Sequence, residues 1–177
     1  ISACLVGSEM CIRDSTDKVT EHWFPGAAAA RVRVDTLTGR VQLEKLVVAA
    51  DVGRAINPER VRQQLLGAAI HGLSTALFEE LAFEDGQPLN ATLLEYQLPS
   101  MLDLPTEFVP VIVEVPHPSG PFGAIGVGET GILAIAPAIS NAILDATGAR
   151  LTQLPMTPER VLAALDAIPS HRGRGLA

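Results

Sequence analysis

At 177 residues, the chain has room for one domain of ordinary size or for a piece of a longer protein. Its net charge of -7 argues against nucleic acid as a partner, because phosphates attract clustered Lys and Arg. We expect no membrane span, since no uninterrupted apolar run approaches the ~20 residues that a bilayer requires. Hydrophobic residues make up 47% and aromatic residues only 4%, so the core must consist of closely packed Ala, Leu, Val and Ile.

The two ends of the chain differ from its body. Residues 1–15 show neither helical nor strand periodicity and resemble the read-through translation of a sequencing adapter. We therefore expect them to be a non-native or disordered leader, and residues 169–177 to be a flexible tail. Both cysteines, Cys4 and Cys11, lie in the leader at a spacing that fits no iron–sulfur motif. No signal peptide is visible, and we expect a cytoplasmic location with the periplasm as the alternative.

The body opens with a predicted β-hairpin followed by a long helix. Residues 29–35 alternate Val with Arg, Thr38-Gly39 predicts a turn, and residues 41–50 read as the return strand. Asn57, as N-cap before Pro58, begins a helix that we expect to run to about residue 82. Its buried stripe is predicted at helical spacing: Leu66, Ile70, Leu73, Leu77 and Leu81. Gly67 and Gly72 inside this helix indicate close approach of another backbone or a ligand.

The second half mixes strands and helices. Residues 85–88 predict a turn, residues 93–98 a short strand or extended segment, and residues 107–115 a strand that Pro110 confines to an edge or a bulge. A helix of small residues is expected over about 137–147, ended by Gly148, and a last helix from the Thr157 cap to about 167. Because the order shows no repeated βαβ unit, the predicted class is α+β, with one long helix and two shorter C-terminal helices.

A glycine-rich loop over residues 121–131 carries the clearest functional signal. Gly126, Gly128 and Gly131 match the GxGxxG pattern, but no strand leads directly into the loop and no helix follows directly, so a dinucleotide-binding turn is disfavoured. Loops stripped of side chains let backbone N–H groups approach a bulky cofactor. Glu129 is the only ionisable residue of this loop, and a carboxylate held there away from bulk water suits a general base. The alternative is an ordinary surface glutamate.

Seven segments, taken in order, resemble the molybdopterin-binding (large) subunits of the xanthine dehydrogenase/aldehyde oxidase family. They cover nearly all of the chain from about residue 21 to 165. The segments are DVGRAINP (51–58), QQLLGAAIHGL (63–73), FEEL (78–81), YQLPS (96–100), PFGAIGVGET (121–130), APAISNAILDATG (136–148) and LPMTPERV (154–161). A series of motifs in register is far more specific than any single motif.

The resemblance implies that residues 16–168 are the C-terminal part of the second molybdopterin-binding domain of a molybdenum hydroxylase. Such enzymes hydroxylate a carbon of an aldehyde or N-heterocycle, and Glu129 would take the proton of the metal-bound hydroxyl group. The loop amides of Gly126, Val127 and Gly128 would lie beside a molybdopterin cofactor, with or without a cytidine nucleotide, and Gln64 would hydrogen-bond its pterin. Ile125 departs from the family pattern, which often has a basic residue there.

The same resemblance implies partners outside this chain. They are the upstream part of the same subunit, iron–sulfur and flavin (FAD) modules on other chains or domains, and a small-molecule substrate. The metal's thiolates come from the pterin, so no protein metal ligands are expected.

Two other functions stay open from the residues. The loop over residues 123–131 could bind a nucleotide or another anion without catalysis, or the segment could serve only subunit assembly. Asp51 is expected to be a turn or capping group, and His71 and His117 are expected to be structural rather than metal ligands. The adjacent pair Glu79-Glu80 is expected to be a solvated edge.

Overall fold

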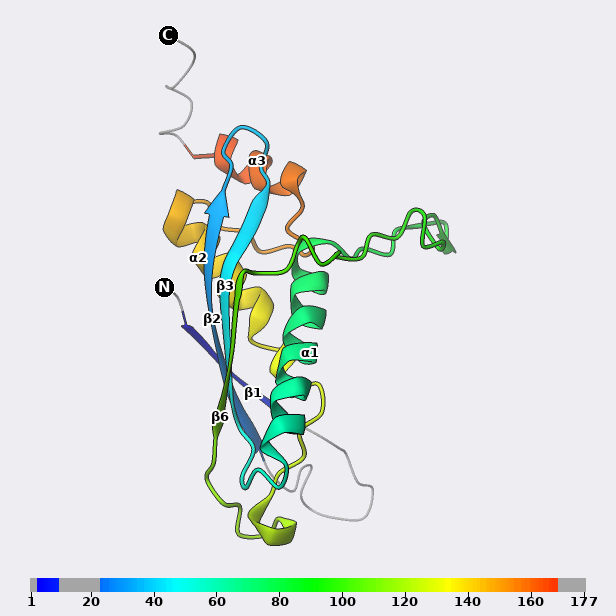
Figure 1. Cartoon of the computed structure of the whole chain (residues 1–177). Coiled ribbons are helices and arrows are strands. Elements are labelled where there is room, and N and C mark those ends of the chain that lie inside the picture. The colour runs from blue at the N-terminus through cyan, green and yellow to red at the C-terminus, as the bar shows by residue number, and fades with distance from the viewer. Residues whose placement is uncertain (1–2, 10–22, 169–177) are drawn as a thin grey trace.

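A four-stranded mixed sheet with helices on one face forms the body of the computed structural model, which describes residues 3–9 and 23–168 (Figure 1). The strand order is β1 (Ala3–Glu9), β2 (Trp23–Val34), β3 (Val41–Asp51), β6 (Glu107–Val113). β1 pairs antiparallel with β2, and β2 pairs antiparallel with β3, whereas β6 runs parallel to β3. This mixture of strands and helices confirms the predicted α+β class.

The first strand corrects one expectation about the leader. Ala3–Glu9 is not unstructured, because its backbone pairs with the start of β2 in the register Ala3 to Ala29. The remainder of residues 1–15 lies outside the described residues, as does the tail over residues 169–177. That the leader is non-native stays a prediction.

The hairpin of β2 and β3 is confirmed, with β2 beginning at Trp23 rather than at residue 29. Its turn uses Gly39 at φ 73°, a left-handed conformation that favours glycine. The register shifts after Arg31, where β3 carries one extra residue, Glu44. The Glu44 carboxylate pairs with the guanidinium groups of both Arg31 and Arg33, at 3.3 and 2.5 Å.

The last strand and the segment before it were predicted in part. β6 lies at the sheet edge, as Pro110 requires, although its parallel pairing with β3 was not predicted. The turn at residues 85–88 is confirmed, because β4 (Phe83–Glu84) and β5 (Gln87–Pro88) form a small hairpin around it. The predicted strand over residues 93–98 is wrong: this segment is turn and irregular backbone without a pairing partner among the described strands.

Helix α1 (Pro58–Leu77) begins as predicted, since Asn57 Oδ1 accepts a hydrogen bond from Arg60 N at 3.1 Å. Two expectations about it are corrected. It ends at Leu77 rather than near residue 82, and the predicted stripe is right only in part: Leu73 and Leu77 are buried as predicted, but small residues such as Ala68 and Ala69 take the place of Leu66 and Ile70. Leu66 and Ile70 are only half-buried and Leu81 is exposed, whereas the buried residues are Leu65, Ala68, Ala69, Gly72, Leu73, Ser74, Ala76 and Leu77.

Two C-terminal helices complete the fold as expected. α2 (Ile135–Thr147) begins two residues before Pro137 and ends at Gly148, whose φ of 78° makes it a left-handed cap. α3 (Pro158–Asp166) is capped by Thr157, which accepts a hydrogen bond from Arg160 N. α1 and α2 cover one face of the sheet, and the core lies between them and alternate residues of β3 such as Leu46, Val48 and Ala50 (Figure 1).

One described segment, Thr130–Thr147, is long and apolar enough by composition to cross a membrane, with a mean hydropathy of 1.3 over 18 residues. The sequence prediction counted only uninterrupted apolar runs and did not single it out. A helix in a protein core has the same composition. Here Ile135, Ile139 and Ile143 of this segment are fully buried against the sheet and α1. The apolar character of α2 is therefore explained by the core.

The two glycines of α1 predict opposite stability effects. A Cβ at Gly72 would lie 2.7 Å from Ile135 Cβ, whereas a Cβ at Gly67 would meet nothing within 4 Å. We expect Gly72→Ala to lower the free energy of unfolding by about 1–3 kcal/mol through overpacking. Gly67→Ala, the matched control, should raise it by up to ~1 kcal/mol through helix propensity. Denaturant unfolding of the 177-residue chain measures both. Equal effects of the two substitutions would contradict the close helix contact.

Candidate functional site

The glycine-rich loop is held at its first half by the loop that follows β3. Arg54 N donates to Gly123 O and Ile125 N donates to Val52 O, each at 2.9 Å. Gly53 adopts φ 65°, and a Cβ there would lie 2.3 Å from Gly123 O, so only glycine allows the two loops to approach.

Asp51 organises the same junction, as expected of a turn-forming residue. Its Oδ1 accepts hydrogen bonds from Gly53 N at 2.9 Å and from Val115 N at 3.1 Å. One carboxylate therefore fixes both the turn after β3 and the chain leaving β6.

The second half of the loop turns onto α1. η2 (Thr130–Ile132) is a single 3-10 turn, and Gly131 lies inside it. A Cβ at Gly131 would be 3.2 Å from Ala68 Cβ and 3.5 Å from Leu65 Cδ2, so the turn sits directly on the buried face of α1. The loop is thus anchored at both ends against the body.

The stretch between these anchors, residues 126–129, is called the bare loop because its backbone amides have no partners among the described residues. Within the described part of the chain, the backbone N–H groups from Gly126 to Glu129 donate no hydrogen bond. A Cβ at Gly128 would meet nothing within 4 Å, and its φ is not left-handed, so neither contacts nor backbone conformation require glycine there. The Thr130 hydroxyl is buried and has no hydrogen-bond partner among the described residues. Free amides, open space and an unpaired hydroxyl suit a bulky polar ligand placed against this stretch.

Glu129 lies at the end of this bare stretch, but it is not withdrawn from water. Its side chain is 80% exposed in this chain, so the expectation of a carboxylate away from bulk water is wrong for these residues. The reason is that this part of the loop lies at the surface of the described residues, where Gly126 is exposed as well. Glu129 Oε1 lies 3.9 Å from His71 Nδ1 on α1, and the sequence analysis had not connected the two residues.

Gln64 lies on the same side of α1 as His71. The two residues are seven positions apart, which is two helical turns and about 10 Å along the axis. Both are exposed, and Gly67 between them leaves the helix surface open. The structure therefore brings Gln64, the bare loop and Glu129 to one face of α1, although 65 residues separate the two side chains in sequence.

The end of α1 carries a second polar cluster. Glu79 and Glu80 are not a solvated edge, because Tyr96 Oη donates to Glu79 Oε2 at 2.6 Å and Arg160 Nη2 lies 2.6 Å from Glu80 Oε1. Partial burial raises the pKa of Glu79, but the hydroxyl groups of Ser74 and Tyr96, together with His71, outweigh it and leave that pKa below its ordinary value of 4.5. The same Glu79 carboxylate raises the pKa of Tyr96.

This contact predicts a pH-dependent contribution to stability. A carboxyl group whose pKa is lowered on folding stabilises the fold above its unfolded pKa, and this contribution is lost as pH falls through the folded value. Tyr96→Phe should therefore lower the melting temperature at pH 7, and the difference from the unchanged chain should shrink below pH 4.5. Calorimetry across pH 3–7 measures it, with Glu79→Gln as the control that should remove the pH dependence. A difference that is the same at every pH would refute the role of the carboxylate.

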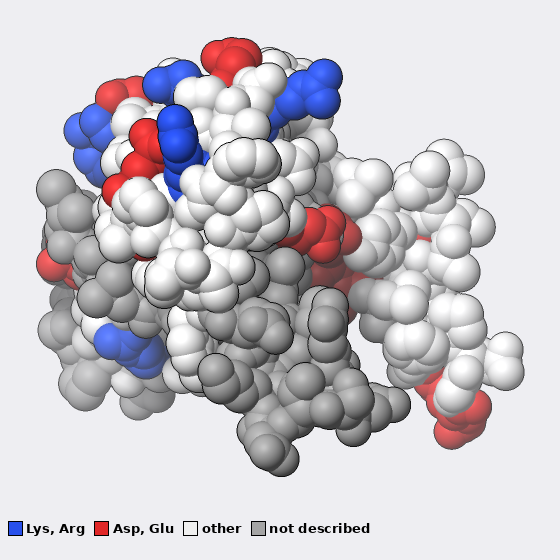
Figure 2. Space-filling view, turned by 90° about the horizontal axis from the view of Figure 1, so that it is seen from below, with Lys and Arg blue, Asp and Glu red and all other residues white. Residues whose placement is uncertain are grey.

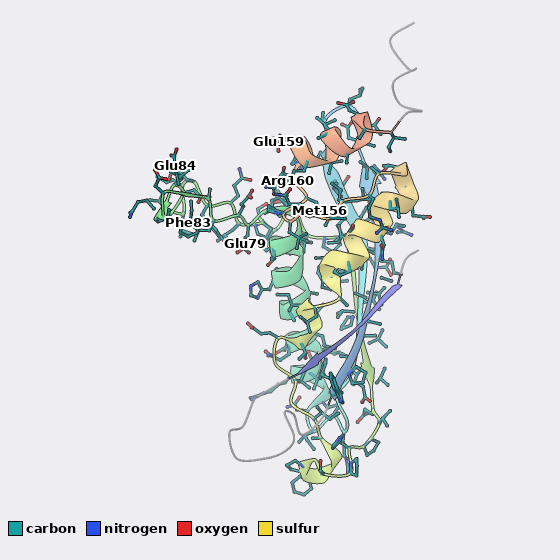
Figure 3. The ribbon with its side chains drawn as sticks, turned by 180° about the vertical axis from the view of Figure 1, so that it is seen from behind. Glu79, Phe83, Glu84, Met156, Glu159 and Arg160 are labelled. Carbon is teal, nitrogen blue, oxygen red and sulfur yellow. The ribbon has the colours of Figure 1, made fainter. Side chains whose placement is uncertain are left out.

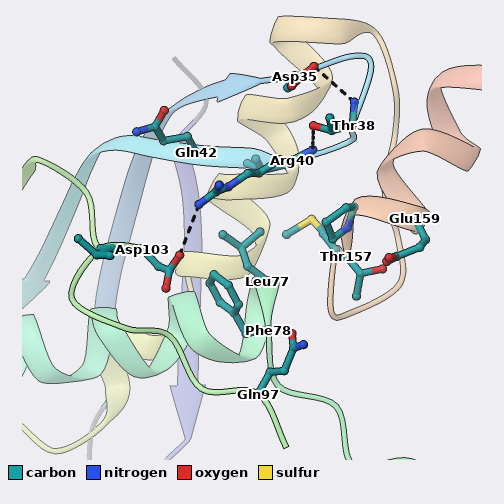
Figure 4. Close-up of a pocket in the computed structure, with 14 residues that line it drawn as sticks. Asp35, Thr38, Arg40, Gln42, Leu77, Phe78, Gln97, Asp103, Thr157 and Glu159 are labelled. Atoms are coloured by element: carbon teal, nitrogen blue, oxygen red, sulfur yellow. Dashed lines mark hydrogen bonds and ion pairs between the residues drawn. The ribbon is translucent and has the colours of Figure 1, made fainter. Parts of the chain in front are cut away.

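A separate cavity lies elsewhere (Figure 4). It has a volume of about 750 Å³ between the β2–β3 turn, the end of α1 and the start of α3. Arg40 lies 3.9 Å from Asp103 across it, and Leu77, Phe78 and Met156 supply apolar wall. None of the predicted site residues lines this cavity. The described residues also contain no group of three or more His, Cys, Asp or Glu side chains that could hold a metal ion.

Fold and loop together define a domain in which a stretch of backbone amides without partners among the described residues ends at one exposed carboxylate. The family model of the molybdopterin cofactor-binding domain matches residues 5–105, which include α1 and Gln64 but not the glycine-rich loop. A probable hypoxanthine oxidase of Escherichia coli K12 is 39% identical over 82% of this chain and 15% of its own length. The aldehyde oxidoreductase of Megalodesulfovibrio gigas is 39% identical over 80% of this chain and 15% of its own.

Solved structures agree with these relatives. The aldehyde oxidoreductase from Desulfovibrio gigas superposes with a TM-score of 0.75 at 39% identity, over 82% of this chain and 16% of that one. Quinoline 2-oxidoreductase from Pseudomonas putida 86 gives a TM-score of 0.77 at 29% identity, over 83% and 19%. The chain belongs to the xanthine dehydrogenase/aldehyde oxidase family of molybdopterin-binding subunits. It spans less than a fifth of the length of these relatives.

Proposed function

We propose that this chain is the C-terminal part of the catalytic subunit of a molybdenum hydroxylase, which adds a water-derived oxygen to a carbon of an aldehyde or N-heterocycle. Glu129 is the general base. One observation supports this proposal above the others: the Glu129 carboxylate ends a stretch of unbonded backbone amides on the face of α1 that also bears Gln64.

The residues of this chain fit a molybdopterin group by their chemistry. Within the described residues the backbone N–H groups of Gly126, Val127 and Gly128 donate no hydrogen bond, which would leave them available to its oxygen and sulfur atoms. Gln64 offers both a donor and an acceptor to the pterin ring, on an exposed helix face. When bound, the molybdenum–pterin group supplies the oxygen and accepts two electrons from the substrate.

In this proposal Glu129 moves one proton. Glu129 would accept, on a carboxylate oxygen, the proton released when the substrate carbon is hydroxylated. A general base depends more on a fixed position than on high basicity. The two anchors of the loop hold Glu129 in such a position beside α1. The exposure of Glu129 in this chain is consistent with a pocket whose other walls come from the rest of the subunit, together with iron–sulfur and flavin modules that carry electrons away.

Replacing the base tests the proposal in the intact subunit. Glu129→Gln keeps the size and loses the negative charge, so kcat/KM should fall by roughly 10²–10⁴-fold while the molybdenum content stays the same. Glu59→Gln is the matched control, because Glu59 is also an exposed carboxylate, at 72% against 80% for Glu129. Steady-state kinetics with metal analysis measures both effects. Normal turnover of the Glu129 variant would refute its role as base.

The second candidate is a module that binds a nucleotide or another anion at the same loop. The free amides of residues 126–129 are the observation in its favour, but the Glu129 carboxylate would repel a phosphate. We therefore expect NAD and ATP to leave the melting temperature of the 177-residue chain unchanged. Saturable stabilisation by either, lost in a Gly128→Val variant, would favour the binding module instead.

A further inference from the structure

A long arm, residues 79–105, projects from the body between the end of α1 and the start of β6 (Figures 1 and 3). The small hairpin of β4 and β5 lies at its far end, where Phe83 and Glu84 are found (Figure 3). Polar contacts hold its two sides together, since Ala82 N donates to Asn90 Oδ1 at 2.9 Å and Asn90 Nδ2 donates to Glu80 O at 2.7 Å.

Polar contacts also fix the arm to the body, at its base. Arg160 of α3 bonds Glu80 and also donates to Pro155 O at 2.8 Å, while Tyr96 bonds Glu79 beside α1. Asp103 at the returning end faces Arg40 of the β2–β3 turn at 3.9 Å. The arm is therefore held in a defined direction by ion pairs with two elements of the body, α3 and the β2–β3 turn, and by the Tyr96–Glu79 hydrogen bond within its own base.

Large apolar side chains of the arm face solvent in this chain. Leu94 is 97% exposed and Leu102 is 92% exposed, values that no packed side chain has. The exposed set is Leu81, Phe83, Leu89, Leu93, Leu94, Leu98, Met101 and Leu102. A contiguous segment with this many exposed large apolar residues indicates an interaction surface, because leaving them in water costs free energy.

The charge of the arm has one sign. No Lys or Arg occurs between Arg62 and Arg150, so every charged side chain of the arm is a carboxylate: Glu79, Glu80, Glu84, Asp85, Glu95 and Asp103. Figure 2 shows acidic side chains and no basic ones on the visible face of the arm. Leu93 and Leu94 lie close in sequence to Glu95, and Phe83 is followed by Glu84 and Asp85. The surface that covers the arm must therefore be apolar, with basic residues at its margin.

We propose that the arm is the docking element that joins this domain to the remainder of its own subunit, through an apolar groove rimmed by Lys and Arg. This inference rests on the proposed function, because both place the chain within a longer polypeptide. The length of the relatives supports this occupant, since more than four fifths of each relative lies outside the matched region.

A second copy of the chain is the competing occupant, and charge disfavours it. Two arms facing one another would bring together carboxylates without a single compensating basic residue, in a chain whose net charge is already -7. The remainder of the same subunit is covalently linked to the arm, so its effective concentration at the arm is high. A separate copy of the chain has no such link.

Limited proteolysis with chymotrypsin tests the proposal, because this protease cleaves after Leu, Phe, Tyr and Met and the arm holds many such sites. In the 177-residue chain the arm should be cut first. In the intact subunit, purified from the reading frame that contains this chain, cleavage within residues 81–103 should be at least about tenfold slower. Equal rates in the two proteins would overturn the proposal.

Two paired variants of the intact subunit sharpen the result. Leu93→Ser with Leu94→Ser should restore rapid cleavage of the arm, whereas Leu37→Ser, at an 88% exposed position in the β2–β3 turn, should not. If the double variant fails to fold, the comparison of the unchanged proteins still decides. Analytical ultracentrifugation of the 177-residue chain should show a monomer. A dimer that the double variant dissociates would identify a second copy as the occupant and refute the proposal.

None of these measurements depends on turnover. If the arm is protected but the Glu129→Gln enzyme is fully active, the proposed chemistry is rejected and the interface is kept. If the arm is cleaved equally fast in both proteins but the Glu129→Gln enzyme is inactive, the interface is rejected and the proposed chemistry is kept.

Discussion

Close contact between α1 and the segment after the glycine-rich loop is the constraint on which the rest of the site depends. Gly72 lets α1 approach Ile135, and Gly131 lets the η2 turn lie on Ala68 and Leu65. A side chain at Gly72 would clash with Ile135, and one at Gly131 would force η2 and Ala68 apart by a few tenths of an ångström. Glu129 immediately precedes η2, so this contact sets its distance from α1.

Local sequence signals were sufficient to predict structure wherever a residue type strongly prefers one backbone position. Asn57 and Thr157 as N-caps, Gly148 as a left-handed cap and Pro110 on an edge strand all follow from backbone chemistry that does not depend on distant residues. The buried face of α1 could not be predicted in this way. Small residues, Ala68, Ala69 and Gly72, share this face with the buried leucines, and small residues carry little signal in a pattern of large apolar ones.

The site was predicted from a resemblance, and the structure tests only its geometry. Nothing in the periodicity of α1 joins Gln64 to Glu129, because it is the packing of η2 against the helix that places Glu129 on the side of α1 that bears Gln64. His71 beside Glu129 was missed for the same reason, although its position two turns after Gln64 was the available signal. The water exposure of Glu129 was mispredicted, since the glycine content of a loop does not show whether the loop lies at the surface.

The run without Lys or Arg from residue 63 to 149 has a practical consequence for peptide mapping. Trypsin cleaves only after these two residues, so it releases residues 63–150 as one fragment. That fragment contains Gln64, most of α1, the arm, β6, the bare loop and α2. A standard tryptic digest would thus leave the whole candidate site, and any chemical label placed on it, in a single peptide too long for routine sequencing by mass spectrometry.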